Sequence, residues 1–203
     1  ALQLNPNHTD AYNNMGMALY DQGRFDEAVE SYQKAVSLEP DFADAHYNLG
    51  NALKQTGELK QAIESYKASL AINPSDAEVL FNFGNALKNY GDFGQAIELY
   101  AKALKISPNY TAAQTNMDNA IEEKTEIDTH VATYASIAEL EIGSAEMVSF
   151  TGGILNARGY HDAAIDRYKQ AIKIKPDYAE AHSDMGIALK DKGELDAAID
   201  SYQ

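Results

Sequence analysis

The sequence predicts an all-α protein, an α-solenoid of antiparallel helix pairs stacked along one axis. Residues of the same type recur at a spacing of 34 along the chain. A fixed period of this length is typical of repeat arrays, in which each unit packs only against its neighbours. Within each period, apolar residues recur at the three- and four-residue spacing of amphipathic helices.

Five residue series carry the period, and each has a structural reason. Small residues let two helices approach closely, a glycine between two apolar stretches permits a turn, and proline ends a helix. The series are the first-helix glycines Gly16, Gly50, Gly84, Gly152 and Gly186; the turn glycines Gly23, Gly57, Gly91, Gly159 and Gly193; the alanines Ala28, Ala62, Ala96, Ala164 and Ala198; the tyrosines Tyr32, Tyr66, Tyr100, Tyr134, Tyr168 and Tyr202; and the prolines Pro6, Pro40, Pro74, Pro108 and Pro176.

This pattern resembles the tetratricopeptide repeat (TPR), a helix-turn-helix unit of the same length. The stretch ADAHYNLGNALKQTGELKQAIESYKASLAINP, residues 43–74, carries the resemblance most fully. It is similar in style to the TPR arrays of O-linked N-acetylglucosamine transferases and of bacterial TPR proteins. The resemblance implies a right-handed superhelix whose first helices line a concave groove.

The first repeat shows how each unit is expected to fold. Its apolar stripes predict helices at residues 9–22 and 25–38, and later repeats should have helices at the same offsets. Gly23 lies where the first helix must end, in a position suited to a left-handed backbone conformation. Gly16 and Ala28 are both small, which predicts that the two helices touch at that point.

We expect the whole chain to form a single TPR array. Its fifth repeat should have a weak first helix, because Gly152 and Gly153 disfavour helix. The expected divisions are 1–8, the tail of a preceding repeat; 9–42, 43–76 and 77–110, regular repeats; 111–144, a diverged repeat; 145–178, the repeat with the weak first helix; and 179–203, a truncated repeat.

The fourth repeat keeps the spacing but loses most of its signature. Asp118 replaces the first-helix glycine, Thr125 the turn glycine, His130 the alanine and Ile142 the proline, while Tyr134 is retained. Its apolar residues still predict two helices at the usual offsets. Asp118 and His130 should face each other, so we expect them to compensate as a hydrogen-bonded pair.

Asparagines form the most informative polar series. Two series three residues apart lie on the same face of the first helices and form a ladder along the array. Asparagine carries both a donor and an acceptor, which suits pairing with a peptide backbone, and the resemblance implies that such a ladder holds extended peptides. Asparagines that merely bond neighbouring repeats, or that persist from duplication, would give the same pattern. The ladder comprises Asn14, Asn48, Asn51, Asn82, Asn85, Asn116 and Asn119; Phe150 and Gly153 replace it in the fifth repeat, and Asp184 and Ile187 in the sixth.

The charge indicates which partners are expected. The net charge of −15 argues against nucleic acid and anionic membranes. The acidity either serves solubility alone, because repeat arrays carry many solvated helix faces, or favours neutral or basic polypeptides over acidic ones. One TPR class grips an acidic C-terminal tail with Lys and Arg, and this basic clamp is missing here. The corresponding positions hold Asn13, Tyr47, Phe81, Thr115, Ser149 and Ser183.

No constellation of catalytic residues is visible. The chain has no Cys, none of its five His residues has a partner His at i+4, and neither a phosphate-binding loop nor a nucleophile elbow occurs. We therefore predict a non-catalytic scaffold without metal or cofactor that binds protein or peptide in the groove. The compartment stays open.

Two other functions fit the same pattern. The chain could be the substrate-recruiting arm of a larger glycosyltransferase-like enzyme. It also begins and stops within a predicted second helix. Either it is a segment of a longer array, or copies stack head to tail into a filament, a contact that does not close.

Overall fold

The structure is a computed structural model that describes residues 8–138, 141 and 143–202. Its described residues form eleven helices and no strands, which confirms the all-α prediction. The chain divides into two compact units, one of Ala1–Lys88 and Gly94–Asp118, the other of Asn89–Phe93 and Asn119–Gln203. The prediction of one array over residues 1–203 therefore stays a prediction, and residues 1–7 of the expected N-terminal tail lie outside the described residues.

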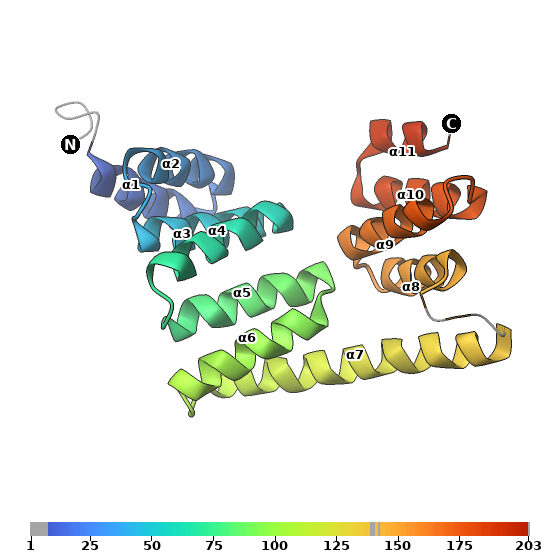
Figure 1. Ribbon diagram of the computed structural model, residues 1–203. Coiled ribbons are helices and arrows are strands. Elements are labelled where there is room, and N and C mark those ends of the chain that lie inside the picture. Colours follow the sequence, from blue (N-terminus) through green and yellow to red (C-terminus); the bar gives the residue numbers. More distant parts are fainter. Residues whose placement is uncertain (1–7, 139–140, 142, 203) are drawn as a thin grey trace. The chain divides into compact units, whose positions relative to one another are not determined.

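Helix pairs build the first unit. Helix α1 packs against α2 and α3 against α4, and α2 also packs against α3 (Figure 1). The helices are α1 Thr9–Asp21, α2 Phe25–Leu38, α3 Ala43–Gln55, α4 Leu59–Ile72, α5 Ala77–Tyr90 and α6 Phe93–Ile106, of which residues 89–93 at the end of α5 and the start of α6 fall in the second unit. The predicted bounds 9–22 and 25–38 differ from those of α1 and α2 by one residue at most. Gly23 and Gly57 adopt the predicted left-handed conformation, with φ of 73° and 85°.

A repeated contact between a glycine and a tyrosine joins the two helices of each pair. A Cβ added at Gly84 would lie 2.6 Å from the ring of Tyr100, and one at Gly50 would lie 2.7 Å from Tyr66. Both rings are fully buried. The prediction that the first-helix glycine meets the alanine of the second helix was therefore imprecise, because the tyrosine ring makes this approach.

The second unit repeats this arrangement. Helix α8 packs against α9 and α10 against α11, and α9 also packs against α10. These helices are α8 Ala145–Ala157, α9 His161–Ile174, α10 Ala179–Lys192 and α11 Leu195–Ser201. Although its sequence is unfavourable, α8 is a helix of 13 residues, capped by Ser144, whose side chain accepts a hydrogen bond from the Met147 amide at 3.3 Å. Gly152 is needed there, because its Cβ would lie 2.8 Å from the Tyr168 ring.

The fourth repeat contains no helix pair. Helix α7, Thr111–Ala138, is a single helix of 28 residues, so the predicted turn at Thr125 was wrong (Figure 1). Asp118 and His130 therefore lie twelve residues apart along one helix, about 18 Å at the usual rise, and their predicted hydrogen bond was also wrong. Asp118 instead accepts a hydrogen bond from Gln114 at 2.9 Å.

Two substitutions explain why α7 continues. Thr125 lacks the freedom of the turn glycines to adopt a left-handed conformation, and its hydroxyl bonds to the Ile121 carbonyl within the helix at 2.7 Å. A side chain at position 118 would also occupy the space that a tyrosine ring fills in the other repeats. Tyr134 accordingly remains 38% exposed, whereas Tyr32, Tyr66, Tyr100 and Tyr168 are at most 2% exposed.

The signature prolines and alanines among the described residues lie where the pattern placed them. Each second helix with a following proline ends two residues before it, as α2 does at Leu38 before Pro40. The second-helix alanines are buried, at 0–3% exposure, and they are Ala28, Ala62, Ala96, Ala164 and Ala198. No helix in the described part of the chain is both long and apolar enough to span a bilayer.

Candidate functional site

The first asparagine series lies between successive first helices. Asn48 donates from Nδ2 to Oδ1 of Asn13 at 3.1 Å, and Asn82 donates from Nδ2 to the Tyr47 hydroxyl at 2.9 Å. In the same way, Asn116 donates to Oδ1 of Asn85 at 2.7 Å. Each bond links one repeat to the next within the first unit. This series therefore uses its amide nitrogens between repeats, and its amide oxygens have no partner in the described part of the chain.

The second series, Asn51 and Asn85, uses its amide oxygens where the first series uses its amide nitrogens. Oδ1 of Asn51 accepts a hydrogen bond from the Tyr66 hydroxyl at 2.7 Å, and Oδ1 of Asn85 accepts one from Tyr100 at 2.8 Å. Here the amide oxygens are used within the structure. At Asn51 one amide hydrogen can reach the nearby Tyr47 hydroxyl, which leaves the other unused, and at Asn85 no bond from Nδ2 is found to any described residue.

The two ends of the ladder differ from its centre. Asn14 and Asn119 are exposed, and neither bonds to another described side chain. Asn119 also falls in the second unit, whereas Asn116 falls in the first. The structure therefore brings together Asn48, Asn51, Asn82, Asn85 and Asn116, which are all half-buried, and leaves Asn14 and Asn119 outside this network.

Tyr47 is the residue that the sequence analysis undervalued. Its hydroxyl accepts from Asn82 and donates to Oε1 of Glu78 at 2.8 Å, so it connects the ladder to a carboxylate of the next repeat. Burial raises the pKa of this hydroxyl, and Glu78 adds to the effect. The sequence did contain a signal, because Tyr47 directly precedes a ladder residue, as Asn13 and Phe81 do.

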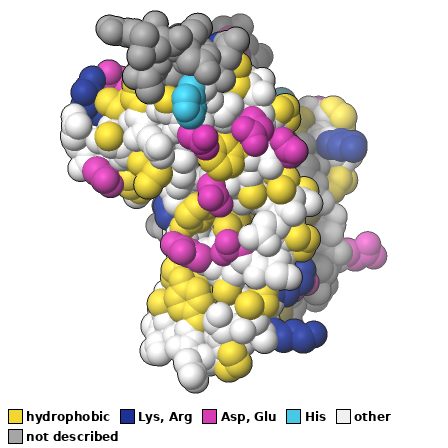
Figure 2. Space-filling model, turned by 90° about the vertical axis from the view of Figure 1, so that its left-hand side faces the viewer, with side chains coloured by type: hydrophobic (Ala, Val, Ile, Leu, Met, Phe, Trp, Pro, Cys, Tyr) yellow, Lys and Arg dark blue, Asp and Glu magenta, His cyan; other side chains and the backbone are white. Residues whose placement is uncertain are grey.

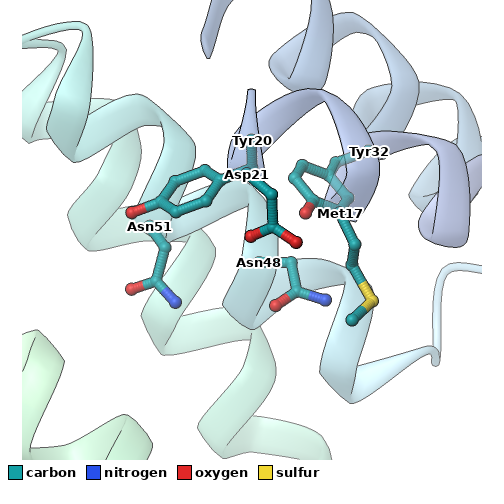
Figure 3. A pocket seen from close by; sticks show the side chains of 6 residues that line it. All are labelled: Met17, Tyr20, Asp21, Tyr32, Asn48 and Asn51. Atoms are coloured by element: carbon teal, nitrogen blue, oxygen red, sulfur yellow. The ribbon is translucent and has the colours of Figure 1, made fainter. Parts of the chain in front are cut away.

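A pocket lies in the first interval of the ladder, by which we mean the space between the first helices of the first and second repeats. Met17, Tyr20, Asp21, Tyr32, Asn48 and Asn51 line a cavity of about 130 Å³ between α1, α2 and α3 (Figure 3). The Asp21 carboxylate points into the space between the two tyrosines and Asn48 in Figure 3. Met17 occupies the position that Asn51 and Asn85 hold in the next two repeats. The usual bond from tyrosine to asparagine is therefore lost in the first repeat.

The second unit replaces the ladder with other contacts. Phe150, at a ladder position, stacks on Tyr134 of α7 with ring centroids 3.9 Å apart. Arg158, which follows α8, forms ion pairs with Glu123 at 3.6 Å and with Glu126 at 3.1 Å. The asparagine-lined surface therefore belongs to the first unit, and the second half of α7 covers part of α8.

The described residues offer no metal site, since no cluster of three or more His, Asp or Glu side chains is placed to hold an ion. The pKa shifts in the first unit concern tyrosine hydroxyls, Lys54 and the exposed pair of Arg24 and Glu27, in which the hydrogen bond between the two raises the pKa of Arg24 and lowers that of Glu27. Burial lowers the pKa of Lys54 and raises that of Tyr66 and Tyr100. What the surface offers is hydrogen-bonding groups in rows, which suits binding.

Family models cover much of the chain. Models described as TPR repeat match residues 16–57, 50–91 and 152–193, and models described as tetratricopeptide repeat match residues 1–30 and 77–110. This chain belongs to the tetratricopeptide repeat family. The models that match describe repeats, and none of them describes an enzyme. These matches leave out residues 111–151, which include α7.

Solved structures show the same fold in other proteins. The crystal structure of YrrB, a TPR protein with an unusual peptide-binding site, is 20% identical with a TM-score of 0.57, and the match covers 89% of this chain and 93% of YrrB. The TPR domain of P58(IPK) is 19% identical with a TM-score of 0.63, covering 95% of this chain and 58% of that one. The first TPR of Spaghetti (RPAP3), bound to the HSP90 peptide SRMEEVD, is 20% identical with a TM-score of 0.56, covering 58% and 93%. A comparison with curated proteins finds no match.

Proposed function

We propose that this TPR protein is a non-catalytic scaffold whose first unit binds an extended segment of another polypeptide along the asparagine ladder. The observation that carries the proposal is that the two asparagine series leave opposite hydrogen-bonding groups unpaired. Asn48, Asn82 and Asn116 retain amide oxygens as acceptors, and Asn51 and Asn85 retain amide hydrogens as donors. A row of acceptors thus runs beside a row of donors.

An extended polypeptide has the groups that such rows require. Its backbone presents N–H donors and C=O acceptors in alternation, at a rise of about 3.3 Å per residue. Packed helices lie about 8–10 Å apart, so one step of the ladder corresponds to about three residues of an extended chain. Two solved proteins of this fold, YrrB and the RPAP3 domain, are described with a peptide-binding site or a bound peptide, which supports the same use here.

The charge supports a neutral or basic partner. Acidic side chains gather in the middle of the face shown in Figure 2, and Lys and Arg side chains lie towards its edges. The first turns of α1, α3 and α5 each contain an acidic residue, namely Asp10, Asp44 and Glu78. These carboxylates also stabilise the helix N-termini, so they are a background preference and not a site in themselves.

The test begins with peptides selected on the full chain from a random twelve-residue display library. Binding of the selected peptides is then measured by fluorescence anisotropy. Asn48→Ala with Asn82→Ala should weaken binding by at least about tenfold, because two hydrogen-bonding residues of about 1 kcal/mol each are removed. Asn73→Ala, in an exposed turn, is the matched control and should leave the affinity unchanged.

A second measurement separates backbone recognition from side-chain recognition. N-methylation of alternate peptide bonds removes N–H donors from the ligand while keeping its side chains. We expect the methylated peptide to lose binding to the natural chain. Unchanged affinity in both the double variant and the methylated peptide would refute the ladder as the binding surface.

A further inference from the structure

The pocket in the first interval differs from its counterparts in its hydrogen bonds. Tyr66 and Tyr100 each donate to an asparagine fifteen residues earlier in the chain, but at the corresponding position Tyr32 faces Met17. A thioether is only a weak acceptor. Tyr32 is 2% exposed, and its hydroxyl has no hydrogen-bond partner among the residues that the structure describes. Although the ring is buried, its hydroxyl lines the pocket with its bonding capacity unused.

The same pocket also differs in charge. In the second and third repeats, the positions of Tyr20 and Asp21 are held by Lys54 and Gln55 and by Lys88 and Asn89. The later repeats therefore have a lysine at this position. The first repeat has Tyr20 in place of that cation, and it has the carboxylate of Asp21 in place of an amide.

The lining residues provide a set of acceptors and no Lys or Arg. Asp21 forms no ion pair with any described residue, and the amide oxygen of Asn48 is also without a partner there. The Tyr20 hydroxyl accepts a hydrogen bond from Gln55 at 3.2 Å, which holds this ring between the two repeats. Asp21 lies between the two tyrosines in Figure 3.

We propose that this pocket binds the guanidinium group of an arginine side chain carried by the partner polypeptide. This inference rests on the proposed function, since it supplies one side-chain position along the asparagine ladder. A cavity of about 130 Å³ has room for about four water molecules, which suits a guanidinium with its adjoining methylenes. The planar group brings five donors for the Asp21 carboxylate, the Asn48 amide oxygen and the Tyr32 hydroxyl, and it can stack on a tyrosine ring.

The test uses a probe that is too small to occupy the ladder. N-acetyl-arginine amide is titrated into the ¹⁵N-labelled full chain, and amide shifts are followed by NMR. We expect saturable shifts for residues 17–21, 32 and 48–51. N-acetyl-citrulline amide has the same shape without the charge and should give no shifts in this range, while N-acetyl-lysine amide should bind several-fold more weakly than the arginine probe.

Two variants locate the interaction. Asp21→Asn removes the carboxylate with little change in shape and should weaken arginine binding about tenfold. Asp26→Asn, an exposed site at the start of α2, removes the same charge outside the pocket and should have little effect. Met17→Asn should restore the bond from tyrosine to asparagine, occupy the Tyr32 hydroxyl and reduce arginine binding by a similar factor.

The outcomes distinguish this inference from the proposed function. If the arginine probe shifts no residue of the pocket, while a library peptide still binds and depends on Asn48 and Asn82, the arginine pocket is overturned and the ladder stands. Equal binding of the citrulline probe, or equal loss in Asp21→Asn and Asp26→Asn, would also overturn it. If library peptides fail to bind as well, both the inference and the proposed function are wrong.

Discussion

The adjacent glycines of α8 should respond in opposite ways to the same substitution. A Cβ at Gly152 would lie 2.8 Å from Cε1 of Tyr168, whereas the nearest atom to a Cβ at Gly153 is the Tyr168 hydroxyl at 3.8 Å. Tyr168 is 2% exposed, so its ring has little room to move aside. The two positions share one helix and one neighbouring side chain, and they differ chiefly in the space for a methyl group.

The magnitudes follow from two opposing effects. Replacing a glycine within a helix by alanine stabilises by about 1 kcal/mol, and only this effect acts at Gly153. Overpacking a buried site costs about 1–3 kcal/mol, and the short distance at Gly152 favours the upper end. Gly152→Ala should therefore destabilise by about 2 kcal/mol, and Gly153→Ala should stabilise by about 1 kcal/mol.

Urea unfolding followed by far-ultraviolet circular dichroism measures both variants against the natural chain. In thermal melts, the two should lie about 6–12 °C apart, at about 2–4 °C for each kcal/mol. The cost of Gly152→Ala should also shrink when Tyr168 is replaced by Leu, because the clashing ring edge is then absent. Shifts in the same direction for both glycines would show that the tyrosine contact does not explain the small residue.

Three further predictions concern pH, a turn and α7. The contribution of Tyr32 and Tyr178 to the free energy of unfolding should be constant up to about pH 10 and fall towards pH 12, because burial raises the pKa of both hydroxyls to about 12 and the unfolded state loses these protons first. Urea titrations from about pH 9 to 11 that compare the natural chain with Tyr32→Phe would contradict this if the tyrosine contribution rose with pH. Gly193→Ala should cost about 1 kcal/mol in the same urea assay, because φ is +92° there, and an unchanged midpoint would count against it. Spin labels at Thr115 and Ser136, both exposed on α7, should lie about 30 Å apart by pulsed electron resonance if the helix is continuous, and a distance below about 20 Å would indicate a helix pair.

The repeat pattern was sufficient to predict most of the fold. Helix bounds, left-handed turn glycines and buried alanines are all local consequences of residue types that recur in phase, so each repeat supported the interpretation of the others. The same regularity led to a wrong prediction at α7. The spacing was kept, but Thr125 and Asp118 had removed both the turn and the space for the tyrosine ring, and a compensating pair was inferred in place of a lost hairpin.

The site could be predicted only in part. The spacing of the asparagines placed them on the first helices, where Asn48 and Asn82 lie. It could not show which half of each amide is used inside the protein, because that depends on Tyr47 and Tyr66, whose hydroxyls reach the ladder only once the helices are packed. The pocket at Met17 was missed for the same reason.

Helix α7 has a consequence for the cooperativity of folding. A repeat array behaves approximately as a one-dimensional chain of units, in which each unit is stabilised by its own helix pair and by its neighbours. Because α7 forms no pair, the glycine–tyrosine contact within the fourth repeat is lost, and the division between the two compact units falls within α7, after Asp118. We expect hydrogen exchange to resolve two subglobal openings with different free energies, one for each unit. Ligand bound to the ladder should then protect the first of these while leaving the second almost unchanged.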